Sequence, residues 1–308
     1  MIRHSNFIQK TPEITFFKSK KHKKPIFSIL IPTWNNLNFL KLCINSLEKN
    51  SRYQHQIILH INDGTDGTID WVKKNGFDFS HSKENIGICL ALNASSTLAN
   101  TDYIVYFNDD MYACPDWDYW LLREVKRQPS DYFFLSSTMI EPRDSNNSCV
   151  IAPYDFGDHP NHFKEKELLN SFKQFKKNDW TGATWPPNLV PKKLWDLVGG
   201  YSTEFSPGMY SDPDFSMKLW SVGVRNFKGV SKSRIYHFMS KSTKKINFKK
   251  FDGRSVFFRK WGISSNVFTT YYLKRGSNWS GSLGEPIINL RIWLKIFLTR
   301  MKLLFQQL

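Results

Sequence analysis

The sequence predicts an α/β fold in which a mostly parallel sheet is flanked by helices. Short apolar runs alternate with stretches whose apolar residues recur every three or four positions. The resulting order of strand, helix, strand, helix and strand requires helical crossovers between parallel strands. The 308 residues are 41% hydrophobic and 16% aromatic, which supplies a buried core and excludes a disordered protein.

The regular part of this pattern lies in the first half of the chain, where apolar strands end in polar loops. The second half is less regular, and Gly223 is the expected stop of its last helix before the tail. The predicted elements are strands at 27–31, 57–61, 103–107 and 132–135, and helices after Asn36, through Trp71, and at about 88–98, 163–177, 194–198 and 214–222, with a loop at 180–187.

Composition divides the chain into three segments. Residues 1–25 form a polar, basic leader without an apolar signal core, residues 26–240 the α/β domain, and residues 241–308 a helical extension. An amphipathic helix is expected near 286–308, with basic residues along one stripe, and such a helix suits a membrane surface. The alternative is a helix packed on its own domain or on a second subunit. No run of 18 uncharged apolar residues predicts a transmembrane span.

The net charge and the cysteine content indicate which partners and which cellular compartment to expect. Lys plus Arg number 43 against 27 for Asp plus Glu, a net charge of +16. This excess either favours anionic partners, such as nucleotides, nucleic acid or acidic lipid, or reflects a lysine-rich composition. The four cysteines show no CxxC spacing, so they indicate neither a zinc site nor a disulfide framework and favour a reducing, cytosolic compartment.

Acidic loops follow two of the predicted strands. Asp63 lies in the loop after the second strand, and Asp109 and Asp110 follow the third. Ligands bind at the carboxyl ends of strands in open α/β sheets, so both loops fall at the predicted binding edge. Carboxylates are suitable ligands for magnesium or manganese, although acidic loops after strands also occur without metal.

Two later positions are further candidates. Asp212 begins a predicted helix, where it is either a general base or a residue that caps the helix and complements its dipole. His237 follows a predicted strand and is either a ligand or a structural histidine. Lys241, with Lys244 and Lys245, either holds diphosphate oxygens or forms a solvated surface.

The order of these segments resembles the family 2 inverting glycosyltransferases of the GT-A fold over residues 26–240. The six matching segments are 31–35 (IPTWN), 62–68 (NDGTDGT), 85–93 (NIGICLALN), 107–117 (FNDDMYACPDW), 199–214 (GGYSTEFSPGMYSDPD) and 236–237 (YH). Asn108 replaces the first carboxylate of the family's DxD motif, and Ser211 replaces the usual Glu before Asp212.

The resemblance implies a Rossmann-like nucleotide-diphospho-sugar transferase fold and metal-assisted, inverting transfer of a hexosyl or related group. The donor would be a nucleotide-diphosphate sugar, and the acceptor a glycan, lipid-linked or other hydroxyl group. Asp212 would be the general base, and Asp110 and His237 would bind manganese or magnesium. The implied nucleotide-sugar contacts are Pro32, Thr33, Asn35, Asp63, Asn85, Gly87, Asn108, Asp109 and Lys241.

We therefore expect a cytoplasmic enzyme at the inner face of the membrane, held there by its C-terminal helix, and do not expect nucleic acid as a partner. The alternative is a non-catalytic protein of the same fold that binds nucleic acid or acidic glycan through its basic surface. Four tryptophans would then be candidate stacking surfaces: Trp34, Trp117, Trp180 and Trp185.

Overall fold

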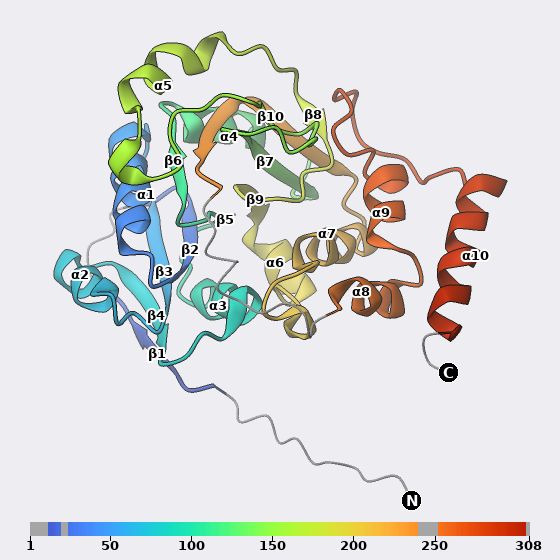
Figure 1. Ribbon diagram of the computed structural model, residues 1–308, viewed down its shortest axis with the longest axis horizontal. Coiled ribbons are helices and arrows are strands. Elements are labelled where there is room, and N and C mark those ends of the chain that lie inside the picture. Colours follow the sequence, from blue (N-terminus) through green and yellow to red (C-terminus); the bar gives the residue numbers. More distant parts are fainter. Residues whose placement is uncertain (1–11, 20–23, 240–251, 306–308) are drawn as a thin grey trace, which may run out of the picture.

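A computed structural model describes residues 12–19, 24–239 and 252–305, and its described strands form one ten-stranded sheet flanked by helices (Figure 1). The strands are β1 (Ile14–Phe17), β2 (Ser28–Trp34), β3 (Gln56–Asn62), β4 (Asp78–Ser82), β5 (Tyr103–Tyr106), β6 (Met111–Ala113), β7 (Phe133–Ile140), β8 (Trp180–Thr181), β9 (Asn188–Pro191) and β10 (Asn226–His237). The α-helices are α1 (Leu37–Asn50), α2 (Thr68–Asn75), α3 (Gly87–Ser96), α4 (Trp117–Val125), α5 (Glu165–Ser171), α6 (Lys192–Val198), α7 (Ser211–Ser221), α8 (Gly253–Trp261), α9 (Ser265–Val267) and α10 (Leu290–Phe305).

The sheet has the strand order β1-β4-β3-β2-β5-β9-β7-β10-β6, with β8 paired to β10. Strands β4, β3, β2 and β5 run parallel to one another, as the alternating pattern predicts. Strand β9 then pairs antiparallel with both β5 and β7, and β6 pairs antiparallel with β10. The α/β prediction is confirmed, and the sheet is mixed because short antiparallel strands complete its second half.

The apolar strands place alternate side chains on opposite faces of the sheet. Leu30 packs into the core that α3, α6 and α7 cover, whereas Ile29 and Ile31 pack into the core beneath α1 and α4. All three side chains are fully buried. This period of two is what a strand covered on both faces requires, and it explains why the run is continuously hydrophobic.

Several elements differ from their predicted bounds. The strand expected at 132–135 continues to Ile140 as β7, because the polar run Ser136–Thr138 is buried within the sheet and hides the strand in the sequence pattern. The helix expected at 163–177 ends as an α-helix at Ser171. Part of the expected leader is ordered as β1, which pairs antiparallel with β4 at the edge of the sheet.

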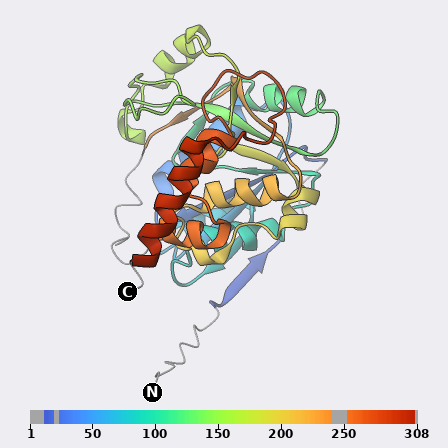
Figure 2. The same cartoon turned by 90° about the vertical axis from the view of Figure 1, so that its right-hand side faces the viewer.

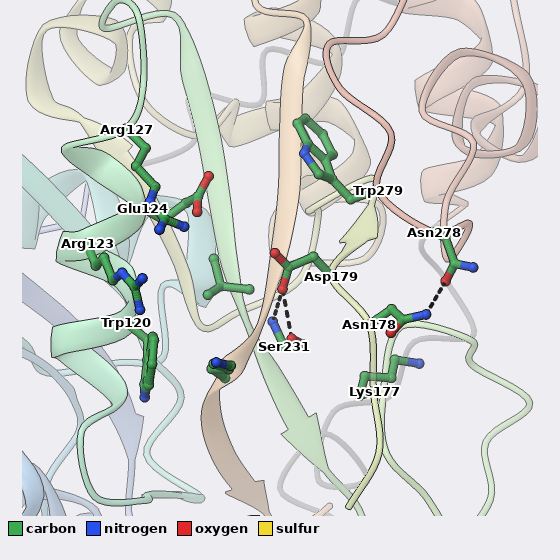
Figure 3. Close-up of a pocket in the computed structure, with 12 residues that line it drawn as sticks. Trp120, Arg123, Glu124, Arg127, Lys177, Asn178, Asp179, Ser231, Asn278 and Trp279 are labelled. Carbon is green, nitrogen blue, oxygen red and sulfur yellow. Dashed lines mark hydrogen bonds between the residues drawn. The ribbon is translucent and has the colours of Figure 1, made fainter.

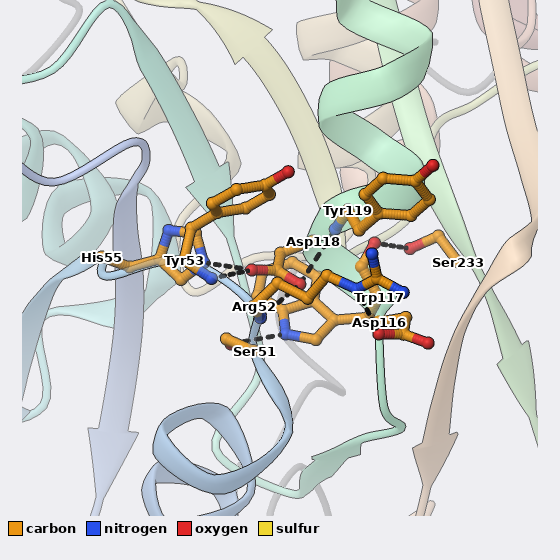
Figure 4. Close-up of polar contacts among 9 residues, drawn as sticks. All are labelled: Ser51, Arg52, Tyr53, His55, Asp116, Trp117, Asp118, Tyr119 and Ser233. Atoms are coloured by element: carbon orange, nitrogen blue, oxygen red, sulfur yellow. Dashed lines mark hydrogen bonds and ion pairs between the residues drawn. The ribbon is translucent and has the colours of Figure 1, made fainter.

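A buried carboxylate joins the start of α4 to the loop after α1 (Figure 4). Asp118 is fully buried and accepts hydrogen bonds from the backbone amides of Arg52 and Tyr53, at 3.0 and 2.9 Å, and lies 3.1 Å from His55 Nε2. Burial raises the pKa of Asp118, but these hydrogen bonds outweigh it and hold the pKa below its ordinary value. Asp118 directly follows residues 115–117, the segment that resembles the family motif, and anchors that part of the chain to the scaffold.

Helix α10 lies on the outside of the domain, beside α9 (Figure 2). The ammonium group of Lys295 donates to the Tyr271 hydroxyl at 3.0 Å, and Ile296 packs against the core. The helix begins at Leu290 rather than near residue 286. Within the described parts of the chain, no helix has the length and apolar character needed to cross a membrane.

Candidate functional site

A cavity of about 480 Å³ lies at the carboxyl ends of the parallel strands. It has the size of a small-molecule site. Most of the predicted site residues line it, and they come from β2, the segment before α3, the loop between β5 and β6, the start of α7 and the end of β10. The predicted residues that line the cavity are Pro32, Thr33, Asn85, Gly87, Asn108, Asp109, Asp110, Asp212 and His237.

Asp109 is held in place by the end of β2. The hydroxyl of Thr33 donates a hydrogen bond of 2.7 Å to Asp109 Oδ2. Burial and the neighbouring carboxylate of Asp110 raise the pKa of Asp109 to about 7, although the hydrogen bond from Thr33 opposes that rise. The pair of adjacent carboxylates is therefore a site where added positive charge would be favourable.

Asp63 and Asn35 do not line the cavity, which differs from their predicted position. Instead they bind one another next to it, with Asn35 Nδ2 donating to Asp63 Oδ2 at 2.8 Å. Asn35 Oδ1 also accepts from the backbone amide of Gly64 at 2.9 Å. These contacts join the ends of β2 and β3, so both side chains shape the rim of the site. Lys241 lies outside the described residues.

His237 lies between two carboxylates. Strand β10 pairs antiparallel with β6 and sets His237 opposite Met111, directly after Asp110. The imidazole Nε2 is 3.5 Å from Asp110 Oδ2, and Nδ1 is 3.0 Å from Glu141 Oε1. Burial disfavours the protonated ring, but Asp110 and Glu141 outweigh it and raise the pKa of His237 to about 10.

Asp212 lies in the first turn of α7 and is oriented by a buried tyrosine. The hydroxyl of Tyr201 donates to Asp212 Oδ1 at 3.1 Å, and the Tyr201 ring stacks on Phe215 with centroids 4.6 Å apart. Burial raises the pKa of Asp212 to about 7, against the opposing effect of this hydrogen bond. The N-cap position of α7 is Tyr210, which makes no side-chain capping bond, whereas Asp212 lies within the first turn of the helix.

The side chain of Asp214 binds residues of α8 and does not line the cavity. This fully buried carboxylate accepts a hydrogen bond from Trp261 Nε1 at 2.7 Å and is 3.0 Å from Lys260 Nζ, which ties α7 to α8. The two acidic residues of α7 thus have different surroundings although only Pro213 separates them. Of these two, only Asp212 lines the cavity.

Gly87 permits a close approach at the start of α3. Its φ angle is +76°, and a Cβ atom there would lie 2.7 Å from the Cα atom of Pro207. The backbone amide of Gly87 donates to Asn85 Oδ1 at 2.9 Å, which closes the turn before the helix. A side chain at position 87 would push apart α3 and the loop before α7, and both segments line the cavity.

Sequence reasoning missed several residues around the site. Glu141 was hidden because β7 was expected to end at residue 135, so its place directly after a strand could not be seen. Tyr201 was recognised only as part of the GGY segment, without a role. The cavity is also lined by residues of the loop before α7, Pro207, Gly208 and Met209, whose residue types indicate no chemical role.

The side chains of Asp110 and His237 fit a hard divalent cation whose coordination shell is completed by a bound substrate. Within the described ranges, no three or more His, Cys, Asp or Glu side chains are grouped to hold a metal ion. The carboxylate of Asp110 and the ring of His237 face the same cavity, and the hydrogen bond of His237 to Glu141 is the arrangement that orients metal-binding histidines. Oxygens from a bound diphosphate would supply the remaining ligands.

Comparisons with known proteins agree with this fold. Residues 28–183 match the model of Glycosyl transferase family 2. The chain is 24% identical over 241 residues to a chondroitin synthase of Pasteurella multocida (strain Pm70) and, to the same extent, to a hyaluronan synthase of Pasteurella multocida. The alignments cover 74% of this chain and 22% of each relative, so the chain spans about a fifth of their length.

Solved structures show the same fold. Crystal structures of residues 1–349 of S. aureus TarS, alone and with UDP, superpose with TM-scores of 0.51 and 0.50 at 16% identity. They cover 69% and 68% of this chain, and 60% of the TarS chain. The chain therefore has the GT-A type of nucleotide-sugar transferase fold. The chain belongs to glycosyl transferase family 2, as the resemblance predicts.

Proposed function

We propose that the chain transfers a sugar from a nucleoside-diphosphate sugar to a hydroxyl group of a glycan, with inversion at the anomeric carbon. The observation that carries this proposal is that Asp212 lines the same cavity as Asp109, Asp110 and His237. One cavity therefore offers a carboxylate for the acceptor and an acidic pair with a histidine for the diphosphate end of the donor. The polysaccharide synthases among the relatives favour a glycan acceptor.

Asp212 would act as the general base. The acceptor hydroxyl gives its proton to the Asp212 carboxylate while its oxygen attacks the anomeric carbon. The bond from that carbon to the diphosphate oxygen breaks, and the diphosphate leaves with the electron pair. Tyr201 fixes Oδ1, whereas Oδ2 accepts no hydrogen bond from the described residues. A base whose pKa lies near 7 is suited to proton transfer at neutral pH.

Asp110 and His237 would hold manganese or magnesium, with Asn108 and Asp109 beside them. When bound, the cation neutralises the charge that develops on the leaving diphosphate. Glu141 keeps the His237 ring turned toward Asp110. Thr33 and Asn85 would contact the nucleotide, and Asn35 and Asp63 would support that side of the pocket from the rim.

A panel of nucleotide sugars tests the function directly. Binding is measured by calorimetry with and without manganese, and release of the nucleoside diphosphate is followed in the presence of glycan acceptors. We expect at least one nucleotide sugar to bind at least tenfold more tightly with manganese than without it, because Asp110 and His237 would hold a cation that offsets the charge of the diphosphate. Nucleoside monophosphates are the matched control and should show a smaller dependence on manganese.

The configuration of the product, observed by NMR, must be inverted relative to the donor. A folded protein that binds no nucleotide sugar with either manganese or magnesium would contradict the proposal. Retention of configuration would contradict the direct attack on the anomeric carbon, while leaving the transferase class intact.

We also propose that the exposed face of α10 attaches the enzyme to an acidic membrane surface. Trp293, Leu294, Phe297 and Leu298 are each exposed by 43% or more although all are hydrophobic. Exposed apolar residues gathered on one face mark an interaction surface, and the net charge of +16 favours an anionic one. The acceptor would then be a lipid-linked or membrane-bound glycan, reached from the cytoplasmic side.

Flotation with vesicles of phosphatidylglycerol and phosphatidylcholine measures this attachment. The double variant Trp293→Glu, Phe297→Glu should lose at least about 80% of the bound fraction, because each glutamate places a charge in the lipid interface. Leu197→Glu with Tyr132→Glu changes two exposed apolar residues elsewhere and should float like the unchanged protein. Equal flotation of all three proteins would refute attachment through α10, and a concentration-dependent dimer lost in the α10 variant would assign that face to a second copy.

A further inference from the structure

A second polar groove lies over α4 and the middle of β10 (Figure 3). It consists of two adjoining cavities of about 510 and 550 Å³, which share Trp120, Lys177, Asn178, Ser231 and Lys232 in their walls. We name it the basic groove because its walls carry Arg123, Arg127, Lys173, Lys176, Lys177, Lys232 and Arg234. Two cavities that share walls suit a ligand that is a chain rather than a single compact molecule.

The basic groove is separate from the catalytic cavity. The two share no lining residue among those that the structure describes. Lys232 and Arg234 line the groove, whereas His237, at the end of β10, lines the catalytic cavity. Arg234 is the groove residue of β10 nearest to His237, and its position three residues earlier corresponds to about 10 Å along a strand at roughly 3.3 Å per residue. A ligand in the groove would therefore not occupy the donor site.

The carboxylates in the groove walls are paired with cations of the protein. Glu124 and Asp179 both bind the buried ammonium group of Lys228, at 2.8 and 3.1 Å. Asp116 pairs with Arg52 at 2.6 Å. In contrast, the basic side chains in the walls make no ion pair with the described part of the chain, so the groove presents a surplus of positive charge to a ligand.

Arg234 places a buried hydrogen-bond donor in the wall of the groove. Its side chain is 7% exposed, and its Nε and Nη2 atoms donate to the carbonyl oxygens of Ser231 and Phe175. The Nη1 atom is buried and has no hydrogen-bond partner among the described residues. A buried guanidinium donor without an acceptor is costly, and an anionic ligand would relieve that cost.

The aromatic side chains of the groove favour recognition of charge over base stacking. The Trp120 ring is already contacted by two cations, with Lys232 Nζ at 4.6 Å and Arg123 Cζ at 5.1 Å from its centroid. Trp279 is contacted by Lys228 at 5.4 Å. Proteins that bind single-stranded nucleic acid use aromatic rings on which bases stack, and these two rings are engaged with the protein's own cations.

The side-chain amides of Asn178 and Asn278 also line the groove, and they both donate and accept hydrogen bonds, as hydroxyl groups require. We propose that the basic groove binds an acidic polysaccharide, a glycan chain that carries carboxylate or sulfate groups. This site goes beyond the proposed transfer reaction, because binding there needs neither donor nor metal. The groove would hold a charged glycan on the enzyme while sugar transfer takes place in the catalytic cavity.

Binding of fluorescein-labelled polygalacturonate oligosaccharides, followed by anisotropy without metal or nucleotide, tests the proposal on the full chain. The fully methyl-esterified oligosaccharide has the same backbone without charge and is the matched ligand control. We expect at least tenfold tighter binding of the acidic form, with affinity that falls as salt is raised. The variant Arg123→Glu, Lys232→Glu should bind the acidic form at least tenfold more weakly, because two attractive contacts become repulsive.

Lys74→Glu with Lys193→Glu produces the same change in net charge at exposed positions outside the groove and should bind within about threefold of the unchanged protein. An equal loss in both double variants would show a general effect of net charge and overturn the proposal. Tighter binding of a thymidine oligonucleotide than of polygalacturonate would reassign the groove to nucleic acid. Failure of this binding leaves the transfer reaction untouched, since the nucleotide-sugar panel measures that separately.

Discussion

Asp212→Asn is expected to lower kcat at least about a hundredfold while nucleotide-sugar affinity changes by less than about threefold. The amide keeps the size of the side chain and its hydrogen bond to Tyr201 but cannot accept the acceptor's proton at neutral pH. A positioned general base contributes roughly a hundredfold to ten-thousandfold to rate. Initial rates of nucleoside-diphosphate release and calorimetric binding of the donor measure the two quantities separately.

Asp214→Asn is the matched control for this variant, because it makes the same chemical change two residues further along α7. Asp214 binds Trp261 and Lys260 instead of lining the cavity, so we expect a lower melting temperature with kcat within about threefold. If Asp212→Asn retained full kcat, Asp212 would not be the base. If both variants lost activity equally, the loss would reflect damage to α7.

The pH dependence follows from the raised pKa of Asp212. Burial disfavours the charged carboxylate and brings the pKa to about 7, so the base is protonated and inactive at lower pH. We expect kcat/KM to rise with pH through about 7 and then level. Tyr201→Phe removes a hydrogen bond that favours the carboxylate, so the rising limb should move to higher pH. A profile in Tyr201→Phe that shifts to lower pH would contradict this assignment.

Asp110→Asn is expected to lower kcat/KM at least about a hundredfold and to weaken manganese binding in the presence of a nucleoside diphosphate. In the proposed reaction this carboxylate would be the charged protein ligand of the cation, 3.5 Å from His237 Nε2, and the cation would offset the charge that develops on the leaving diphosphate, a contribution of about several kcal/mol. Manganese affinity is read by electron paramagnetic resonance, independently of turnover. Asp116→Asn removes a carboxylate that pairs with Arg52 and should leave manganese affinity unchanged.

Glu141→Gln should have an intermediate effect. Glu141 contacts the imidazole of His237, and outer partners of metal-binding histidines are worth about tenfold to a hundredfold in metal affinity. We expect manganese to bind more weakly than in the unchanged protein and more tightly than in Asp110→Asn. Unchanged manganese binding in both variants would show that Asp110 and Glu141 do not contribute to a metal site in this cavity.

Much of the site could be predicted because its residues directly follow apolar strands or open helices. Thr33, Asp109 and Asp110 follow the pattern of a buried strand that ends in a polar loop. Asp63 follows the same pattern, yet its side chain binds Asn35 and lies outside the cavity lining. The strand pattern fixes at which edge of the sheet a residue lies, but the local turn decides where its side chain points.

The α/β class, the parallel first half of the sheet and the family could be read from the amino-acid order, because they follow from hydrophobic periodicity and from motifs contiguous in the chain. Four features became visible only in the folded chain: the mixed second half of the sheet, the contact of Glu141 with His237, the orientation of Asp212 by Tyr201 and the basic groove. Each of these joins residues from separate elements. Their proximity depends on strand pairing and helix packing, which local patterns do not encode.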